Sequence, residues 1–185
     1  MRVIGGTHRG RPIASVSGRG TRPTGDRVRE AVFNILGGRL DGERVLDLYA
    51  GTGALGIEAL SRGAGSAWFI DRDRAAVATV TANLDTLGLA DRGAVVRRDL
   101  TRRPWHLPAG PFDLVFMDPP YRLGLIPPTL AGLRAEGLLA PGARIVAEHG
   151  TDDPTPTAAG FTAADRRRYG KTLVTFFLCD MEKNF

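Results

Sequence analysis

The feature of the sequence that most constrains the fold is an alternation of short apolar runs with longer amphipathic segments. Five runs predict strands, at residues 44–49, 66–71, 93–99, 112–118 and 142–149, and three segments between them predict helices, at residues 54–63, 74–88 and 125–136. Because parallel strands are joined by helical crossovers, this pattern predicts an α/β fold with a doubly wound, mainly parallel sheet. Residues 161–179 hold two apolar runs without a helix, so they predict an antiparallel hairpin at one edge.

The N-terminal part departs from this pattern. Residues 3–6 and 11–16 are expected to pair as a short β-hairpin, and a helix is expected to begin near Thr24 and to end at the glycine pair 37–38. The buried face of that helix is expected to carry Val28, Val32, Ile35 and Leu36. We therefore expect a short arm at residues 1–23 and one globular domain at residues 24–185.

Composition excludes several classes of protein. A chain of 185 residues with a single cysteine, Cys179, has no internal disulfide, and His8, His106 and His149 do not have metal-ligand spacing, so we expect no metal. There is no apolar run long enough to span a bilayer and no secretory signal at the N-terminus. These features predict a cytoplasmic protein that does not bind membranes.

Positive charge is concentrated at the N-terminal end. Residues 1–39 hold eight arginines against one aspartate and one glutamate, a net charge of +6 in a chain whose total is +5. The clustering favours binding of RNA phosphates, although arginines can also form an ordinary solvated face, and the excess of 23 arginines over two lysines is typical of coding bias. The predicted RNA contacts are Arg9, Arg11, Arg19, Arg22, Arg27, Arg166, Arg167 and Arg168.

A glycine-rich segment between a predicted strand and a predicted helix indicates a cofactor site. Gly51, Gly53 and Gly56 satisfy the pattern G-x-G-x-x-G, and Asp71 ends the next strand 20 residues after Gly51. An acid at that position is typical of a residue that binds a ribose diol. The pattern alone also suits nicotinamide dinucleotides.

Two further acids narrow the choice of cofactor. Asp47 lies inside an apolar strand, where its carboxylate needs a polar partner, and the ammonium group of S-adenosylmethionine is one candidate. The alternative is that Asp47 accepts backbone amides of the loop that follows. Asp99 follows another strand and could accept a hydrogen bond from an adenine amino group, or could simply form a turn.

The segment Asp118-Pro119-Pro120-Tyr121 follows the strand predicted at residues 112–118 and points to the acceptor. Two prolines stiffen the backbone, so that Asp118 and the carbonyl of Pro119 can bind both hydrogens of an exocyclic amine. Tyr121 can stack on a base that is unpaired or has left its helix. Stacking uses only the ring, so we expect Tyr121→Phe, which keeps the ring, to have a mild effect. A simple Asp-Pro turn is the alternative.

Several stretches together resemble one known family. The sequences VLDLYAGTGALGIEALSRGA, IDRD, RRDL and FMDPPY resemble motifs of Rossmann-like, class I, S-adenosylmethionine-dependent methyltransferases. The sequences GGTHRGR, RPTGDRVREAVFNIL and YGKT are similar to the RsmD family of 16S rRNA guanine-N2 methyltransferases. The resemblance implies a seven-stranded sheet with an antiparallel last strand, a catalytic domain at residues 24–185, and methyl transfer to the guanine conventionally numbered 966.

The resemblance also implies roles for individual residues. Asp118, Pro119, Pro120 and Tyr121 would hold the target guanine. The cofactor S-adenosylmethionine, converted to S-adenosylhomocysteine, would be bound without a metal by Asp47, Tyr49, Ala50, Gly51, Thr52, Gly53, Asp71, Arg72, Asp99 and Leu100. The partner would be 16S rRNA within a partly or fully assembled small ribosomal subunit. Separately, the sequence has no long apolar stripe or heptad pattern, so we expect a monomer.

Three alternatives remain open at this point. A nicotinamide-dependent oxidoreductase would use the glycine loop but not residues 118–121. An amino-methyltransferase that acts on DNA adenine or protein glutamine would use both. An RNA-binding module without enzymatic activity would need the basic arm but not the acids at the strand ends.

Overall fold

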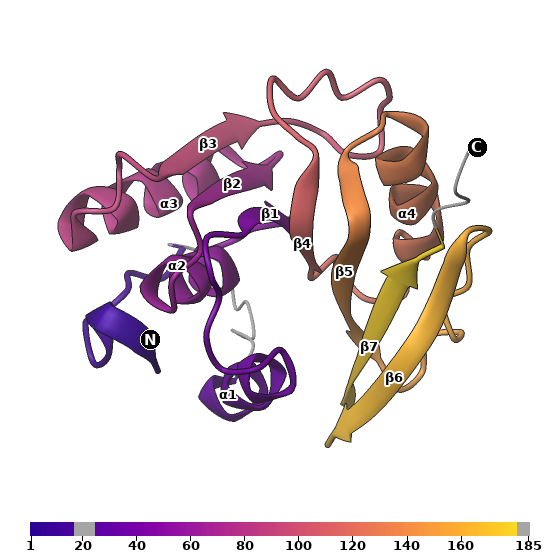
Figure 1. Cartoon of the computed structure of the whole chain (residues 1–185), viewed down its shortest axis with the longest axis horizontal. Coiled ribbons are helices and arrows are strands. Elements are labelled where there is room, and N and C mark those ends of the chain that lie inside the picture. Colours follow the sequence, from indigo (N-terminus) through magenta and orange to yellow (C-terminus); the bar gives the residue numbers. More distant parts are fainter. Residues whose placement is uncertain (17–24, 181–185) are drawn as a thin grey trace. The chain divides into compact units, whose positions relative to one another are not determined.

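The structure, a computed structural model, describes residues 1–16 and 25–180 (Figure 1). The chain divides into two compact units, Met1–Arg98 and Asp99–Phe185. The elements of the first unit are η1 Gly6–His8, α1 Asp26–Ile35, β1 Arg44–Leu48, α2 Ala54–Ser61, β2 Ser66–Asp71, α3 Arg74–Leu87 and β3 Gly93–Arg97. Those of the second are β4 Phe112–Met117, α4 Ile126–Ala135, β5 Leu139–Gly150, β6 Phe161–Tyr169 and β7 Thr172–Cys179.

The seven strands follow the order β3-β2-β1 in the first unit and β4-β5-β7-β6 in the second. In the first unit β2 pairs in parallel with both β1 and β3. In the second unit β4 and β5 are parallel, and β7 is antiparallel to both β5 and the edge strand β6. The predicted Rossmann-like α/β fold, with its mainly parallel sheet and its antiparallel last strand, is confirmed.

Helices of the first unit lie close to their strands. Helix α2 packs against β1 and β2, and α3 packs against β2 and β3. A Cβ at Gly56 would collide with the ring of Phe69, so a glycine there lets α2 approach β2. Asp73 is the N-cap of helix α3, and its carboxylate accepts a hydrogen bond from the backbone N–H of Ala75 at 2.9 Å.

The buried face of α1 differs from the prediction. Val32 and Leu36 are buried as expected, but Val28 is half-buried and Ile35 is 41% exposed, while Arg29 and Phe33 are fully buried. The guanidinium of Arg29 donates to the backbone carbonyl of Arg2 at 2.6 Å and to Asp26 at 3.1 Å. The helix is therefore rotated so that this arginine faces inward, because its polar partners lie there.

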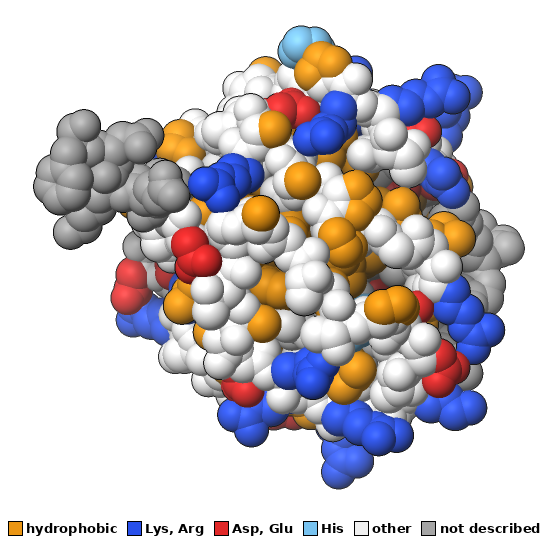
Figure 2. All heavy atoms as spheres, turned by 90° about the vertical axis from the view of Figure 1, so that its right-hand side faces the viewer, with side chains coloured by type: hydrophobic (Ala, Val, Ile, Leu, Met, Phe, Trp, Pro, Cys, Tyr) orange, Lys and Arg blue, Asp and Glu red, His pale blue; other side chains and the backbone are white. Residues whose placement is uncertain are grey.

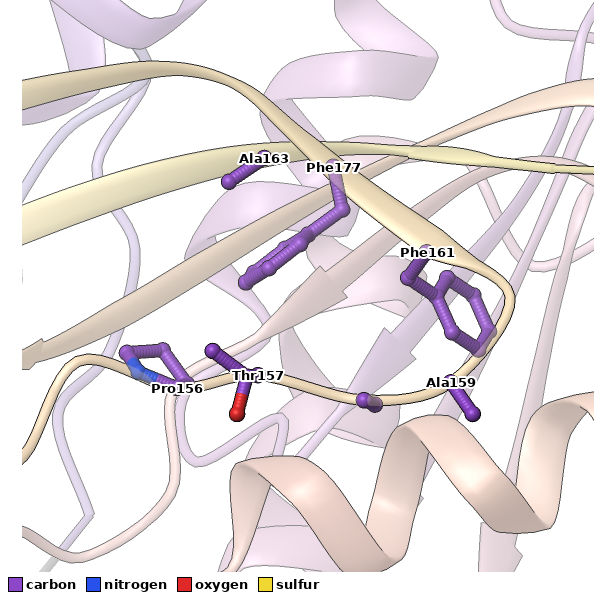
Figure 3. A pocket seen from close by; sticks show the side chains of 7 residues that line it. Pro156, Thr157, Ala159, Phe161, Ala163 and Phe177 are labelled. Carbon is purple, nitrogen blue, oxygen red and sulfur yellow. The ribbon is translucent and has the colours of Figure 1, made fainter.

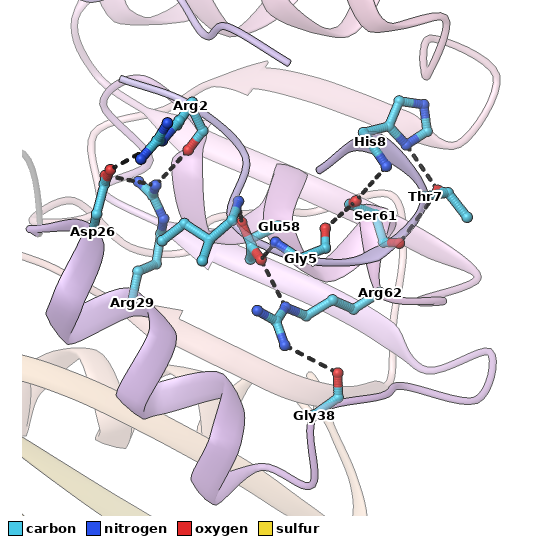
Figure 4. Close-up of polar contacts among 11 residues, drawn as sticks. Arg2, Gly5, Thr7, His8, Asp26, Arg29, Gly38, Glu58, Ser61 and Arg62 are labelled. Carbon is cyan, nitrogen blue, oxygen red and sulfur yellow. Dashed lines mark hydrogen bonds and ion pairs between the residues drawn. The ribbon is translucent and has the colours of Figure 1, made fainter. Parts of the chain in front are cut away.

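The N-terminal hairpin is not found as predicted. Among residues 1–16, strand pairing is limited to one bridge between Arg2 and Pro12, and a 3₁₀ turn occupies the region expected to hold the end of the first strand. The backbone N–H groups of Ile4 and Gly5 donate instead to the carboxylate of Glu58 on α2, at 2.8 and 2.7 Å (Figure 4). The buried carboxylate of Glu58 thus binds two backbone amides that a longer hairpin would have paired with its second strand.

Further contacts attach this segment to the first unit. The hydroxyl of Ser61 donates to the carbonyl of Gly5 at 2.6 Å and accepts from the N–H of His8 at 2.9 Å. Glu58 also pairs with Arg62 at 2.7 Å, and the Arg62 guanidinium lies over the ring of Phe33. Val3, Ile13 and Val16 are buried. Residues 17–23, which would complete the proposed arm, lie outside the described residues, so its boundary remains a prediction.

In the second unit, β5 is buried and β6 is exposed along most of its length. Helix α4 has two prolines, Pro127 and Pro128, in its first turn, where the missing N–H groups have no cost to the helix. The connection predicted at residues 151–160 is largely exposed. In the described part of the chain, no helix is long and apolar enough to cross a membrane.

Candidate active site

The loop between β1 and α2 has an unusual backbone conformation. Tyr49, Gly51 and Gly53 all have positive φ angles, of 62°, 56° and 76°. A positive φ is easy for glycine but costs free energy for a tyrosine, and such strain tends to persist at functional sites. The N–H of Ala50 donates to the carbonyl of Ile70 at 3.1 Å, which fixes the start of the loop to β2.

The three glycines of the motif have different roles. A Cβ added to Gly51 would have only the carbonyl of Tyr49 within 4 Å, at 3.9 Å, so space is open beside this residue. A Cβ on Gly53 would lie 3.1 Å from Val80, and one on Gly56 would collide with Phe69. Gly53 and Gly56 therefore serve packing, whereas Gly51 leaves room for a ligand to approach the backbone.

Asp71 joins the glycine loop to the end of β2. Its two carboxylate oxygens accept hydrogen bonds from the N–H of Gly51 at 3.0 Å and from the N–H of Asp73 at 2.9 Å. The residue is half-buried, and a carboxylate has further acceptor positions for a ligand. The adjacent Arg72 is exposed, and its carbonyl accepts from the guanidinium of Arg97 at 3.1 Å.

Asp47, next to the last residue of β1, is 2% exposed, and its carboxylate accepts a hydrogen bond from the N–H of Gly56 at 2.9 Å. Burial raises the pKa of Asp47 to about 8, the bond from Gly56 opposes the rise, and the charge of Asp71 adds to it. The partner of Asp47 is thus a backbone amide, which belongs to helix α2 rather than to the loop before it. A cation placed beside Asp47 would lower this pKa, which suits the ammonium end of S-adenosylmethionine.

Asn83 on α3 was missed by the sequence analysis. It is 3% exposed, and its amide accepts from the N–H of Ala14 at 2.8 Å and donates to the carbonyls of Ala14 at 3.2 Å and Thr52 at 3.0 Å. One side chain therefore ties the N-terminal segment to the glycine loop. The sequence did hold a signal, because Asn83 is a polar residue on the apolar face formed by Ala76, Val80, Leu84 and Leu87.

The second unit holds the predicted acceptor residues. Asp118 is half-buried directly after β4, Pro119 is buried and Pro120 is exposed. The hydroxyl of Tyr121 donates to Glu148 at 2.6 Å and lies 3.3 Å from the hydroxyl of Thr172. Burial raises the pKa of Tyr121, and the bond to Glu148 and the charge of Asp118 raise it further. Residues 118–121 thus form an ordered segment, anchored at its last residue.

Residues of the connection after β5 hold the chain just beyond this segment. Arg122 has a φ of 65°, and its N–H donates to Asp153 at 2.7 Å. The second oxygen of Asp153 accepts from the N–H of Gly150, also at 2.7 Å, and Asp152 pairs with the Arg122 guanidinium at 3.0 Å. The sequence pattern predicts only an exposed connection here, because these contacts depend on the fold.

Asp99 and Leu100 belong to the second unit and lie in a local turn. The carboxylate of Asp99 accepts from the N–H and the hydroxyl of Thr101, at 3.0 and 2.7 Å, as expected for a turn-forming aspartate. Leu100 is buried, and its carbonyl accepts from the indole of Trp105 at 3.1 Å. Their contribution to cofactor binding stays a prediction.

The predicted RNA contacts lie on the surface where they are described. Arg9, Arg11 and Arg27 are exposed, and Arg11 donates to the carbonyl of Thr86 at 3.0 Å, while Arg19 and Arg22 lie outside the described residues. The exposed arginines of β6 have local partners, which are Thr155 for Arg166, Asp165 for Arg167 and Gly170 for Arg168. Figure 2 shows basic side chains at several separate places around one face of the molecule.

A pocket in the second unit has a volume of about 260 Å³ and is lined by the connection after β5 and by residues of β6 and β7 (Figure 3). Its lining residues are Pro156, Thr157, Ala158, Ala159, Phe161, Ala163 and Phe177, which include none of the predicted site residues. Within residues 1–16 and 25–180, no group of His, Cys, Asp and Glu is arranged to hold a metal ion.

Comparison with known proteins relates the whole chain to one family. The family model described as Conserved hypothetical protein 95 matches residues 1–178. Over 157 residues the chain is 40% identical to ribosomal RNA small subunit methyltransferase D of Escherichia coli (strain K12), covering 85% of this chain and 78% of that protein. The solved structure of yhhF from Escherichia coli is 35% identical, with a TM-score of 0.83 and coverage of 98% of this chain and 99% of the other.

A more distant likeness concerns the fold. An RNA methyltransferase from Salinibacter ruber, solved in complex with S-adenosyl-L-homocysteine, has a TM-score of 0.63 at 19% identity, with coverage of 86% of this chain and 95% of the other. The match over residues 1–178 and the 40% identity to the Escherichia coli enzyme are far more specific. The chain belongs to the RsmD family of ribosomal RNA small subunit methyltransferases.

Proposed function

We propose that this protein transfers a methyl group from S-adenosylmethionine to the exocyclic N2 of a specific guanine in 16S rRNA, in the cytoplasm. The observation that carries the proposal is the family membership, with 40% identity to ribosomal RNA small subunit methyltransferase D. The ordered segment Asp118–Tyr121 supports the choice of an amine as the acceptor, because it combines a carboxylate, prolines and a ring.

In the first unit, the residues around the glycine loop would bind the cofactor. The open space beside Gly51 admits a ligand close to the backbone, and the half-buried Asp71 has acceptor capacity left for ribose hydroxyls. Asp47, with its raised pKa, would gain a favourable interaction with an ammonium group. When bound, S-adenosylmethionine supplies an electrophilic methyl group on its sulfonium. Tyr49, Ala50, Thr52, Gly53, Arg72, Asp99 and Leu100 complete the proposed set of cofactor residues.

In the second unit, residues 118–121 would hold the guanine. Asp118 and the carbonyl of Pro119 would accept hydrogen bonds from the amine, which favours the pyramidal, reactive form of the nitrogen. Tyr121 would stack on the base, a contact worth roughly 1–3 kcal/mol. Catalysis would then come mainly from positioning, since a reactive geometry removes much of the entropic barrier.

The proposed partner is 16S rRNA, either naked or within an assembling small subunit. The exposed arginines of the N-terminal segment and of β6 would contact its phosphates, and the protein would act as a monomer. The described arginines in this set are Arg9, Arg11, Arg27, Arg166, Arg167 and Arg168.

Labelled methyl transfer tests the proposal directly. Transcribed 16S rRNA, which carries no modifications, is incubated with the protein and labelled S-adenosylmethionine, both naked and reconstituted with ribosomal proteins, and the product nucleosides are separated. The expected product is N2-methylguanosine. Asp118→Ala should lower the single-turnover rate by about 100-fold or more while S-adenosylhomocysteine affinity changes little, because the lost bonds matter most in the transition state.

Parallel reactions separate the other candidate functions. DNA and a peptide with an acceptor glutamine are offered to the same enzyme, because an acid-Pro-Pro-Tyr segment also suits those amines. Label in DNA or peptide but not in rRNA would reassign the substrate, and tight binding of NADH without binding of S-adenosylhomocysteine would exclude a methyltransferase.

A further inference from the structure

We propose that Glu148 is a positioning residue that fixes the orientation of the Tyr121 ring. Thr172 and Gly150 also hold this ring, and we call the three residues Glu148, Gly150 and Thr172 the seat of Tyr121. The inference rests on the proposed function, in that the ring is taken as the platform for the target base. Glu148 is 9% exposed, and its carboxylate accepts the Tyr121 hydroxyl at 2.6 Å, a short hydrogen bond to a charged acceptor.

The strand register explains how the seat is assembled. Glu148 and Gly150 are two residues apart on β5, so they lie on the same face of the sheet. Thr172, at the start of β7, pairs directly with Gly150, and its hydroxyl lies 3.3 Å from the Tyr121 hydroxyl. The three residues thus meet on one face. His149 lies between Glu148 and Gly150 and bonds to the hydroxyl of Thr175 at 2.9 Å instead.

Gly150 controls the position of the ring itself. A Cβ at this residue would lie 3.1 Å from Oδ2 of Asp153, 3.2 Å from Cδ2 of Tyr121 and 3.6 Å from Cγ of Tyr121, so the carboxylate and the ring both approach a bare backbone. The φ angle of Gly150 is outside the positive range, and its N–H is held by Asp153. The absence of a side chain at Gly150 therefore serves the approach of the ring and of Asp153, because the backbone does not require glycine.

The seat changes the effect that is expected when the hydroxyl of Tyr121 is removed. Stacking alone would make the hydroxyl dispensable, whereas the structure uses the hydroxyl to fix the ring from its far end. A ring held at both ends loses little conformational entropy when a base stacks on it. More of the stacking energy therefore remains to hold the base in a reactive position. Removal of the hydroxyl also leaves the buried carboxylate of Glu148 without this bond.

Single-turnover methyl transfer onto transcribed 16S rRNA is measured for Glu148→Ala, Glu148→Gln, Tyr121→Phe and Gly150→Ala. Glu148→Ala and Tyr121→Phe should each lower the rate at least about tenfold, with S-adenosylhomocysteine affinity changed less than about twofold. Glu148→Gln should recover most of the rate, because its amide oxygen still accepts the hydroxyl. The double variant Glu148→Ala/Tyr121→Phe should be no slower than either single variant. The rate of Gly150→Ala should lie between that of Glu148→Gln and those of the two slow single variants, Glu148→Ala and Tyr121→Phe. Tyr169→Phe, on β6, serves as the control.

A second measurement does not depend on the reaction. The protein is labelled with fluorotyrosine, and the ¹⁹F resonance of Tyr121 is assigned by its loss in Tyr121→Phe. Glu148→Ala should move this resonance towards the position of a solvent-exposed tyrosine, and Glu148→Gln should not. An unmoved resonance, or rates within about twofold of the parent in both Glu148→Ala and Tyr121→Phe, would overturn the inference. Failure of the parent enzyme to methylate rRNA would instead refute the proposed function, and the resonance would still decide whether Glu148 seats the ring.

Discussion

The side chain of Asn83 donates a hydrogen bond to the backbone carbonyl of Thr52 at 3.0 Å, which links helix α3 to the glycine loop. The same amide satisfies both backbone groups of Ala14. A loop with positive φ angles at three of its five residues, 49–53, needs such external support to keep its shape.

Replacement of Asn83 by alanine should therefore weaken both the fold and the cofactor site. Three hydrogen bonds are lost and backbone groups are left without partners, so the free energy of unfolding should fall by about 1–3 kcal/mol. Affinity for S-adenosylhomocysteine should fall at least about fivefold in calorimetry, because the glycine loop loses its anchor. Asn34→Ala, on the exposed side of α1, is the matched control. Unchanged affinity in folded Asn83→Ala would show that the loop does not depend on this anchor.

Alanine substitutions at Gly51 and Gly53 should act differently. At Gly51 the new Cβ meets open space within the protein, so the loss should appear mainly in cofactor affinity. At Gly53 it meets Val80 at 3.1 Å, so thermal stability should fall as well. Gly88→Ala is the control for backbone strain, because Gly88 has a φ of 68° with nothing within 4 Å and lies at the end of α3. Equal affinity losses in Gly51→Ala and Gly88→Ala would argue against ligand contact at Gly51.

Asp47 should make stability depend on pH. Its carboxyl has a pKa of about 8 in the folded state against an ordinary value of 3.8, so between these values the folded state keeps a proton that the unfolded state has lost. The favourable contribution of Asp47 to the free energy of unfolding is complete below pH 3.8. As pH rises from 3.8 to about 8, this free energy falls by up to about 1.4 kcal/mol per pH unit. Asp47→Asn stays neutral and should lack this fall, so it should exceed the parent in stability at pH 8 more than at pH 5. Urea denaturation without cofactor at both pH values measures the difference, and parallel curves would contradict it.

RNA docking by the N-terminal segment is best tested with point substitutions. Deletion of residues 1–16 would also remove the partners of Glu58, Ser61 and Asn83, and would damage the first unit. Arg9→Ala and Arg27→Ala should each make the plot of log affinity for 16S rRNA against log salt shallower, by roughly 0.7–0.9 per lost phosphate contact. Arg39→Ala, an arginine in an exposed pair with Asp41, should leave the slope unchanged. If all three variants keep the parent slope, the predicted contacts at Arg9 and Arg27 are wrong.

Sequence patterns predicted the sheet and the placement of its helices well, because periodicity reports burial along a single stretch of chain. The strand predicted at residues 44–49 contains β1, Arg44–Leu48, and the glycine motif forms the loop that follows it and the first turn of α2. The face of α1 was misjudged, since periodicity treats Arg29 as solvent-facing. Its burial depends on Asp26 and on the carbonyl of Arg2, which lies 27 residues away.

The sequence by itself determined the α/β class, the antiparallel end of the sheet, the glycine loop and the family, because each is encoded in contiguous residues. Only the tertiary structure decided which side chains support the site. Glu58 captures the amides of Ile4 and Gly5, Asn83 joins Ala14 to Thr52, and Glu148 holds Tyr121. These partners are 27 to 69 residues apart, and strand register and helix packing bring them together. A hydrogen bond acts over about 3 Å, so its partner is set by position in space rather than by separation along the chain.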